Sequence, residues 1–189
     1  MRCFGEGEPL YERYHDEDWG RPRTSEQALY EKVCLEGFQA GLAWITVLRK
    51  REALREVFAG FDPETVAAYD GVEHLMADTR LIRSRPKLAA VVRNARATLA
   101  LRESGGLPAL LWAAAQVPSP AYDAWTDVPP STPVAAGVAR TLKRAGFTFV
   151  GPTTVYSRMQ ACGLVGDHQT TCPVRAEVEA ERAAVVRPT

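Results

Sequence analysis

The feature that most constrains how this chain can fold is a cysteine and a histidine close to each of its two ends. Cys3 and His15 lie in the first segment, and His168 and Cys172 lie in the last, in a chain with only three histidines and four cysteines. Two thiolates and two imidazoles form a complete tetrahedral ligand set for zinc. The sequence therefore predicts one structural zinc per chain, which would fasten the two end segments together and leave no coordination position open. The alternative is four unrelated residues, because the spacing matches no common zinc finger.

The composition is that of an ordinary globular protein. The chain has 189 residues, of which 46% are hydrophobic and 24% charged, so we expect a single domain over residues 1–189 with a sizeable core. No apolar run is long enough to span a bilayer, and the polar first twenty residues show no signal peptide. Reduced thiols in a cytoplasm are a better expectation than a disulfide framework. Cys34 and Cys162 lie in apolar surroundings and are expected in the core.

Helical patterns cover almost the whole chain, and no sustained alternation predicts strands. Capping residues or prolines predict the start of a helix at several positions. These positions are Thr24 (a capping box with Gln27), Asp62, Pro86 and Thr132. Residues 105–130 are rich in proline and alanine and are interpreted as a connector with one short helix over 107–115. The segment 176–189 is either a last helix or a frayed end. We expect an all-α fold.

The charges are unevenly spread although the formal net charge is zero. Residues 79–102 hold seven basic side chains and residues 128–166 hold four, and neither segment contains an acid. Such segments can present a positive face to a polyanion. The alternative is that acids from elsewhere in the fold neutralise them.

Residues 143–162 have the pattern of helix, tight hairpin, helix. Gly146 suits the end of the first helix, and Pro152 suits the start of the second. Compared with the general helix-hairpin-helix element, Gly151 is the second glycine and Phe149 replaces the first. Such a hairpin directs backbone N–H groups toward phosphate, unless it is an ordinary helical turn. The candidate DNA contacts are Lys143, Arg144, Phe149, Gly151 and Thr153, with Arg158 nearby.

Glu36 is the only charged residue between positions 33 and 48. It shares an apolar helical face with Leu29 and Val33, where a carboxylate is costly unless it is paired or functional. Aromatic residues lie close by in the sequence; they are Tyr11, Tyr14, Trp19 and Trp44. An acid among aromatic rings can hold a flat, cationic ring by stacking and charge. The alternative is a glutamate that is paired inside the fold.

Four stretches of the chain resemble the DNA-3-methyladenine glycosylase I family. They are Y-H-D-E-D-W-G (14–20), C-L-E-G-F-Q-A-G-L-A-W-I-T-V-L-R-K-R (34–51), G-F-T-F-V-G (146–151) and M-Q-A-C-G-L-V-G-D-H (159–168). The resemblance runs from about Cys3 to Cys172 with the motifs in the same order. It implies an all-α helix-hairpin-helix glycosylase fold, with two helical lobes around a base pocket and a structural zinc that joins the two ends.

The resemblance also implies an activity and a set of site residues. The activity is excision of 3-methyladenine from alkylated double-stranded DNA, the first step of base excision repair. The implied zinc ligands are Cys3, His15, His168 and Cys172. The base-recognition carboxylate corresponds to Glu36, with Tyr14 and Trp44 lining the pocket and Trp19 close by. Phe4 stands near the place of a family tryptophan and would be a smaller stacking face.

Further expectations concern the reaction and the setting. Asp167, beside a zinc ligand, is expected to support the metal group, and the absence of an obvious lysine nucleophile predicts no lyase step. We expect a monomer in a bacterial-type cytoplasm, associated with the nucleoid when it acts. One alternative is a non-catalytic helix-hairpin-helix DNA-binding module. An iron–sulfur glycosylase is disfavoured because the four cysteines are too dispersed for a cluster.

Overall fold

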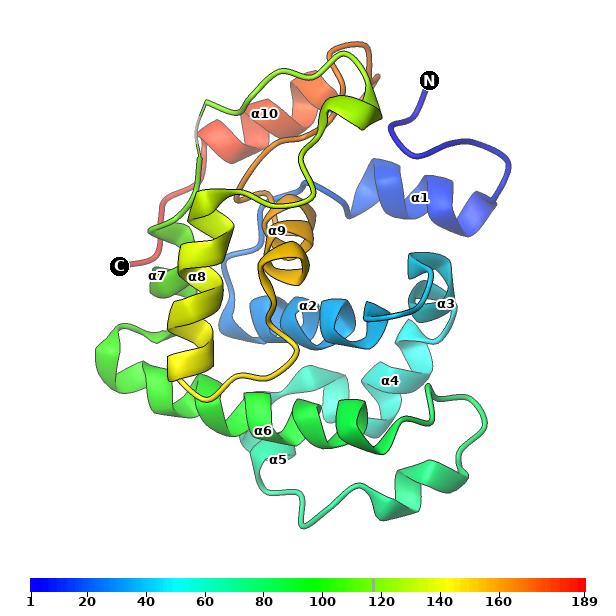
Figure 1. Ribbon diagram of the computed structural model, residues 1–189, viewed down its shortest axis with the longest axis vertical. Helices are drawn as coiled ribbons and strands as arrows, with labels where there is room; N and C mark the ends of the chain where they lie inside the picture. Colours follow the sequence, from blue (N-terminus) through cyan, green and yellow to red (C-terminus); the bar gives the residue numbers. More distant parts are fainter. Residues whose placement is uncertain (117) are drawn as a thin grey trace.

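In the computed structural model, which describes residues 1–116 and 118–189, all regular structure is helical and that part contains no strand (Figure 1). The α-helices are α1 (Pro9–Glu17), α2 (Glu26–Gln39), α3 (Trp44–Arg49), α4 (Arg51–Val57), α5 (Pro63–Ala67), α6 (Arg85–Leu101), α7 (Gly106–Trp112), α8 (Pro133–Arg144), α9 (Pro152–Ala161) and α10 (Arg175–Ala183). Short 3-10 turns are η1 (Ala59–Phe61), η2 (Glu73–Ala77), η3 (Arg102–Ser104) and η4 (Trp125–Asp127). The predicted all-α class is confirmed.

Side-chain caps explain where several helices begin. Asp62 accepts a hydrogen bond from the Thr65 N–H at 2.8 Å, and Thr132 accepts one from the Ala135 N–H at 3.1 Å, as the sequence predicted. The predicted cap of α2 was wrong by one residue. Ser25, not Thr24, has the extended backbone of an N-cap, and its hydroxyl accepts from the Ala28 N–H at 3.3 Å.

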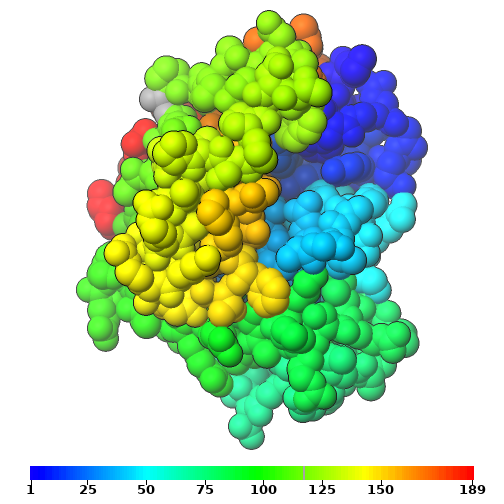
Figure 2. Space-filling view, in the orientation of Figure 1, coloured from blue at the N-terminus to red at the C-terminus, as the bar shows by residue number. Residues whose placement is uncertain are grey.

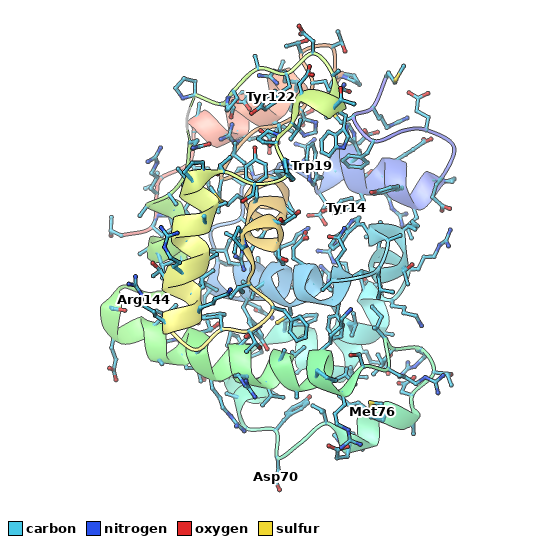
Figure 3. All side chains as sticks on the ribbon, viewed as in Figure 1. Tyr14, Trp19, Asp70, Met76, Tyr122 and Arg144 are labelled. Carbon is cyan, nitrogen blue, oxygen red and sulfur yellow. The ribbon has the colours of Figure 1, made fainter. Side chains whose placement is uncertain are left out.

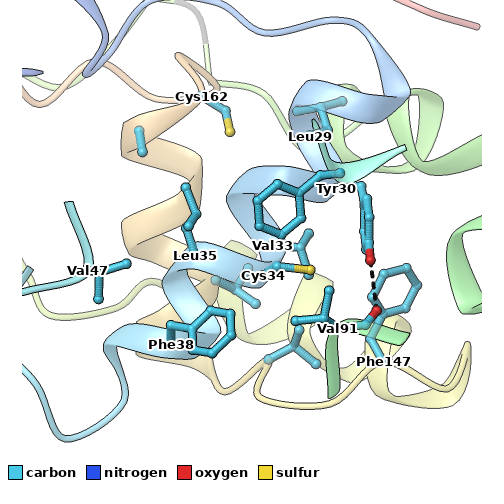
Figure 4. Packing of buried hydrophobic residues seen from close by; sticks show 14 of the residues in the cluster. Leu29, Tyr30, Val33, Cys34, Leu35, Phe38, Val47, Val91, Phe147 and Cys162 are labelled. Carbon is cyan, nitrogen blue, oxygen red and sulfur yellow. Dashed lines mark hydrogen bonds between the residues drawn. The ribbon is translucent and has the colours of Figure 1, made fainter. Parts of the chain in front are cut away.

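Helix α2 runs through the middle of the molecule (Figure 1). Every residue from Leu29 to Phe38 is buried, because α6, α7 and α9 pack around this helix. Figure 4 shows its apolar side chains in the core, where the Tyr30 hydroxyl donates to the Val91 carbonyl at 2.8 Å. Cys34 and Cys162 are both buried there, as predicted. Because the helix is enclosed on most sides, it carries Glu36 into the interior.

The connector and the C-terminal helix α10 lie in the upper part of the molecule in Figure 1. The predicted short helix of the connector is α7, and η4 is the only other regular turn in the described part of residues 113–130. Of the two alternatives for the tail, the last helix is present as α10. It is anchored by Val178, which is buried, and by Arg182, whose Nε donates to the Gly163 carbonyl at 2.7 Å. None of the described helices is long and apolar enough to cross a membrane.

Candidate functional site

The two cysteines and two histidines from the ends of the chain lie together. The potential ligand atoms of Cys3, His15, His168 and Cys172 are all within 4.8 Å of one another, and all four residues are buried. The Cys172 Sγ lies 3.3 Å from His168 Nδ1, and the Cys3 Sγ lies 3.6 Å from the same nitrogen. His15 turns its Nε2 toward Cys172 Sγ at 3.6 Å. The four side chains therefore form a closed group that can bind a metal ion.

The second nitrogen of each histidine has an oxygen partner. His15 Nδ1 lies 2.8 Å from the Asp16 carboxylate, and His168 Nε2 lies 3.2 Å from the Trp19 carbonyl. Metal-bound histidines in proteins are held in this way by an oxygen on their other nitrogen. The expectation that Asp167 supports this group was wrong. The Asp167 carboxylate accepts instead from the Tyr156 hydroxyl at 2.6 Å and from Gln160 Nε2 at 2.7 Å.

An aromatic pocket lies next to the metal-binding group. It has a volume of about 160 Å³ and contains the carboxylate of Glu36. Its walls are Phe4, Tyr11, Tyr14, Trp19, Gln39, Trp44, Trp125, Ser157 and Gln160. The volume is below the ~300–1,000 Å³ of sites for drug-sized ligands, so the pocket suits one small flat ring. In Figure 2 the surface is hollowed where α1, α2, α9 and the connector meet, and Figure 3 shows Tyr14 and Trp19 beside this region.

The structure brings together all the aromatic residues that the sequence assigned to the pocket. The ring of Phe4 lies 6.4 Å from that of Tyr14 and meets the ring of Trp19 edge-on at 5.1 Å. Tyr14 lies 5.3 Å from Trp44. The buried indole N–H of Trp44 has no hydrogen-bond partner within the described chain. Phe4 is thus part of the wall, and Trp44 offers a donor that a bound ring can use.

Trp125 is a pocket residue that the sequence analysis missed. It belongs to η4 and lies 5.9 Å from both Phe4 and Trp19. Its side chain remains 40% exposed, so it stands at the mouth of the pocket. The signal was weak, because a lone tryptophan in a proline-rich connector has no helical pattern to place it.

Burial dominates the electrostatics of Glu36. The residue is only 4% exposed, and this desolvation raises the pKa of its carboxyl to about 7, with Lys32 and Arg158 acting in the opposite direction. No described side chain donates a hydrogen bond to it. A cationic ring in the pocket would supply both the charge and the N–H donors that this carboxylate lacks.

The hairpin between α8 and α9 is held in place by α6 and α2. The Thr148 N–H donates to Asn94 Oδ1 at 2.9 Å, and Asn94 Nδ2 donates back to the Thr148 carbonyl at 3.3 Å. Gly37 of α2 leaves room for Phe149, because a Cβ at Gly37 would lie 3.2 Å from the Phe149 Cβ. These contacts fix the turn that leads into α9.

The first turn of α9 is open to a ligand. No side chain caps this helix at Gly151, so its first backbone N–H groups lack an internal partner. A groove of about 190 Å³ runs from Thr153 and Thr154 to Glu36 and Gln39. It also passes Leu42, an exposed apolar side chain after α2. The helix start and the aromatic pocket therefore belong to one continuous surface.

The unusual backbone conformations of the hairpin lie at Gly146 and Phe149, not at Gly151. Gly151 has an ordinary extended backbone (φ −69°), so no left-handed conformation explains its glycine. A Cβ there would meet nothing within 4 Å, which leaves open space in front of the helix start. The left-handed residues are Gly146 (φ 94°) and Phe149 (φ 56°). Phe149 thus takes the conformation that glycine adopts most easily.

The two acid-free basic segments differ in how far acids neutralise them. In the first, acids from elsewhere pair with three of the seven basic residues; the ion pairs are Arg80 with Asp78 and Glu56, Arg85 with Glu73, and Arg102 with Glu26 and Glu64. Lys87 and Arg96 donate to backbone carbonyls instead. In the second segment, Lys143 and Arg144 are exposed and form no salt bridge within the part of the chain that is described. Figure 3 shows Arg144 at the end of α8.

Arg158 was wrongly expected at the DNA-facing surface. It points inward from α9, and its exposed fraction is 0%. It therefore cannot contact phosphate, and the candidate phosphate contacts reduce to the helix start and the cations at the end of α8.

A larger cavity of about 430 Å³ is also lined by Tyr14. Its walls are a network of ion pairs, in which Asp18 binds Lys32 and Arg51 while Glu31 binds Arg51 and Arg55. Because the charges are satisfied by one another, this cavity is a solvated salt-bridge network, and the smaller aromatic pocket is the better ligand site.

Known proteins resemble the chain over almost its whole length. The sequence profile of the methyladenine glycosylase family matches residues 4–176. A DNA-3-methyladenine glycosylase of Haemophilus influenzae is 43% identical over 180 residues, which are 92% of this chain and 97% of that protein. DNA-3-methyladenine glycosylase 1 of Escherichia coli is 45% identical over 170 residues, 87% of this chain and 91% of that protein. A solved structure of 3-methyladenine DNA glycosylase I from Staphylococcus aureus, described as the structural basis of 3-methyladenine recognition, superposes with a TM-score of 0.88. It is 34% identical and covers 92% of this chain and 95% of that one.

Proposed function

Because the chain belongs to the methyladenine glycosylase family, we propose that it is a DNA glycosylase that excises 3-methyladenine from alkylated DNA. The bond that breaks is the N-glycosidic bond between the base and C1′ of the deoxyribose, and water supplies the hydroxyl that C1′ gains. The observation that carries this proposal is a buried, unpartnered carboxylate, Glu36, in an aromatic pocket of the size of one base.

The chemistry of the lesion fits this pocket. A 3-methylated adenine in DNA carries a positive charge, which already weakens its glycosidic bond, so the enzyme must mainly extrude and hold the base. Glu36 accepts the N–H groups of the base and favours its charge. The rings of Tyr14, Trp44 and Phe4 stack on it or enclose it, and Trp19 supports them. No lysine is among the described residues that line the pocket, which supports a monofunctional reaction without a lyase step.

The hairpin and the start of α9 are the proposed contact with double-stranded DNA, in a helix-hairpin-helix arrangement. Backbone N–H groups at Gly151 and Thr153 would bind a phosphate, and Phe149 shapes the turn. Lys143 and Arg144 add positive charge that no acid in the described chain neutralises. The groove from Thr153 to Glu36 places this phosphate contact next to the base pocket.

Zinc is the metal that best fits the group formed by Cys3, His15, His168 and Cys172. Two sulfurs, two nitrogens and a buried, closed arrangement are the properties of structural zinc sites. When bound, the ion would join the two end segments and hold Phe4 and Tyr14, each adjacent in sequence to a ligand. It would take no part in the reaction, because all four positions are filled by protein.

The setting follows from the same features. Buried apolar side chains form one continuous cluster from Cys3 to Cys172, which supports a single domain over residues 1–189, with helical groups on both sides of the pocket. A complete pocket within one chain supports action as a monomer. The bacterial relatives support a cytoplasmic site of action at the nucleoid.

Base release is the direct test. The protein is incubated with methylated double-stranded DNA, and the released bases are separated by chromatography. We expect 3-methyladenine among the products and intact strands until the abasic sites are cleaved chemically. DNA binding without any released base would instead support the non-catalytic DNA-binding module.

A further inference from the structure

Arg158 is a charged side chain that the proposed reaction does not use. It lies on α9, is fully buried, and none of its three guanidinium nitrogens has a hydrogen-bond partner in the described chain. A buried arginine without partners is costly, since a charge removed from water needs a compensating charge. We therefore looked for the negatively charged group that compensates the buried Arg158 guanidinium.

The answer lies across the interface between α9 and α2. These helices pack against each other, and Ser157, next to Arg158, lines the same pocket as Glu36. Glu36 is the group of α2 whose charge acts on Arg158, because the buried Cys34 thiol stays neutral. Glu36 is the only carboxylate among the groups that act on it. Arg158 in turn is one of two cations that act on Glu36. The two buried, unpartnered charges thus compensate each other without a direct hydrogen bond.

Lys32 is the second cation. It lies one helical turn before Glu36 on α2, is 1% exposed, and has its own partner in Asp18 at 3.1 Å. Its ammonium also lies 4.9 Å from the centre of the Tyr14 ring, which lines the base pocket. Lys32 therefore adds a second positive charge that acts on Glu36, although it also forms an ion pair with Asp18.

The other titratable groups that sense Glu36 are neutral near pH 7. They are Tyr11 and Tyr14 of α1 and Cys162 after α9. Burial raises the pKa of all three, and that of Cys162 reaches about 12. Desolvation on one side and the two cations on the other thus decide the charge of Glu36.

We propose that Arg158, together with Lys32, is a positioning residue that favours the ionised form of Glu36 inside the closed core. The inference rests on the proposed function for its consequence. A carboxylate only accepts hydrogen bonds and suits a cationic base, whereas a protonated carboxyl also donates one and suits a neutral purine. Arg158 does not line the pocket, but through the charge of Glu36 it makes the pocket prefer cationic bases to neutral ones.

The test measures the titration of Glu36 without substrate. Carbon-13 NMR follows the carboxyl signals against pH, and the Glu36 signal is assigned as the one missing in Glu36→Gln. We compare Arg158→Met, which removes the charge at similar volume, with Arg158→Lys, which retains a charge. We expect the titration midpoint to rise by about one pH unit or more in Arg158→Met. In Arg158→Lys it should stay close to that of the parent.

The outcomes separate this inference from the proposed function. An unchanged midpoint in Arg158→Met, or equal shifts in the Met and Lys variants, would overturn the role of the Arg158 charge. A shifted midpoint in proteins that release no base would retain the inference and reject the glycosylase. If both hold, base release by Arg158→Met should be weak at pH 7 and recover at higher pH, while Arg158→Lys follows the parent.

Lys32→Met gives an independent arm if Arg158→Met does not fold. Asp18 remains paired with Arg51 and Arg23 in this variant, so no buried acid is left alone. We expect a midpoint shift in the same direction as for Arg158→Met. A midpoint that does not rise would contradict the proposal that buried cations keep Glu36 ionised.

Discussion

A carboxylate enclosed by aromatic rings loses most of its hydration, and Glu36 regains a partner when a cationic base fills the pocket. Replacing it by glutamine keeps the shape and removes the charge. We expect Glu36→Gln to lower the rate of 3-methyladenine release by roughly 10- to 100-fold, because a hydrogen bond to a charged group contributes about 1.5–3 kcal/mol. Chromatography of the released base measures this. Glu103→Gln, at an exposed position, is the control, and equal loss in both variants would count against Glu36.

The same residue makes a prediction about stability. Burial raises the pKa of Glu36 from 4.5 to about 7, so the folded protein holds a proton that the unfolded chain has released between these values. Stability linked to Glu36 is therefore complete below about pH 4.5 and declines as the pH rises to about 7.

The variant Glu36→Gln isolates this effect because it cannot titrate. We expect equal stability of variant and parent near pH 4.5, and a more stable variant at pH 8, by up to about 3 kcal/mol. Urea unfolding at the two pH values measures the difference in the free energy of unfolding between variant and parent. The contributions of all other titrating groups cancel in this difference. A difference that does not grow with pH would mean that Glu36 is solvated or paired in solution.

Among the elements, the hairpin between α8 and α9 carries the prediction for DNA binding. Lys143→Ala/Arg144→Ala should weaken binding to undamaged duplex DNA and reduce the slope of log affinity against log salt by roughly one for each phosphate that the variant no longer binds. Fluorescence anisotropy at several salt concentrations measures both. Arg80→Ala/Arg85→Ala is the matched control, since those arginines are already paired with acids. If the control variant loses more DNA affinity than Lys143→Ala/Arg144→Ala, the DNA contacts the region around α6 instead of the hairpin.

Gly151→Glu tests the helix start separately from the cations. The position has open space in front of it and an ordinary backbone conformation, so the variant should fold. A carboxylate there would repel phosphate, and we expect a clear loss of DNA affinity with unchanged binding of free 3-methyladenine. Quenching of tryptophan fluorescence by the free base measures the second quantity. Undiminished DNA binding would mean that the hairpin is only a structural turn and does not contact DNA.

The elements also show what the sequence can predict. The buried Glu36 was predictable because it is the only charge in residues 33–48, which include the second half of α2. Caps at Asp62 and Thr132 act over three residues, so local sequence contains the whole interaction. Arg158 could not be placed, since the acid it faces lies on another helix. Trp125 was missed for a related reason, because only the path of an irregular connector brings it to the pocket.

At the scale of the whole molecule, the metal-binding group joins segments that are more than 150 residues apart. We expect one zinc per chain by elemental analysis, and loss of zinc in Cys172→Ala. Losing even ~3 kcal/mol should lower the Tm of a chain of this size by about 10 °C. Cys162→Ala removes another buried cysteine, outside the group, and should retain zinc. A Cys172→Ala protein with full zinc and the Tm of the parent would contradict the assignment of Cys172 as a zinc ligand.

The group should affect the pocket as well as stability. Its ligands alternate with pocket residues, Cys3 with Phe4 and His15 with Tyr14, and the Trp19 carbonyl lies against His168. We therefore expect Cys172→Ala to bind free 3-methyladenine more weakly even at temperatures where it is folded. The residue types predicted this group, but only the fold shows that it also forms the back of the pocket.

The separation of 165 residues between Cys3 and His168 has a consequence for the biosynthesis of the protein. Chains leave the ribosome from their N-terminal end, and helices α1 to α6 emerge and can pack before the second half of the ligand group has been made. Phe4 and Tyr14 reach their final places only when Cys172 has emerged. In a nascent chain the base pocket around Glu36 is therefore incomplete until Cys172 has emerged, and we expect base recognition to begin only then.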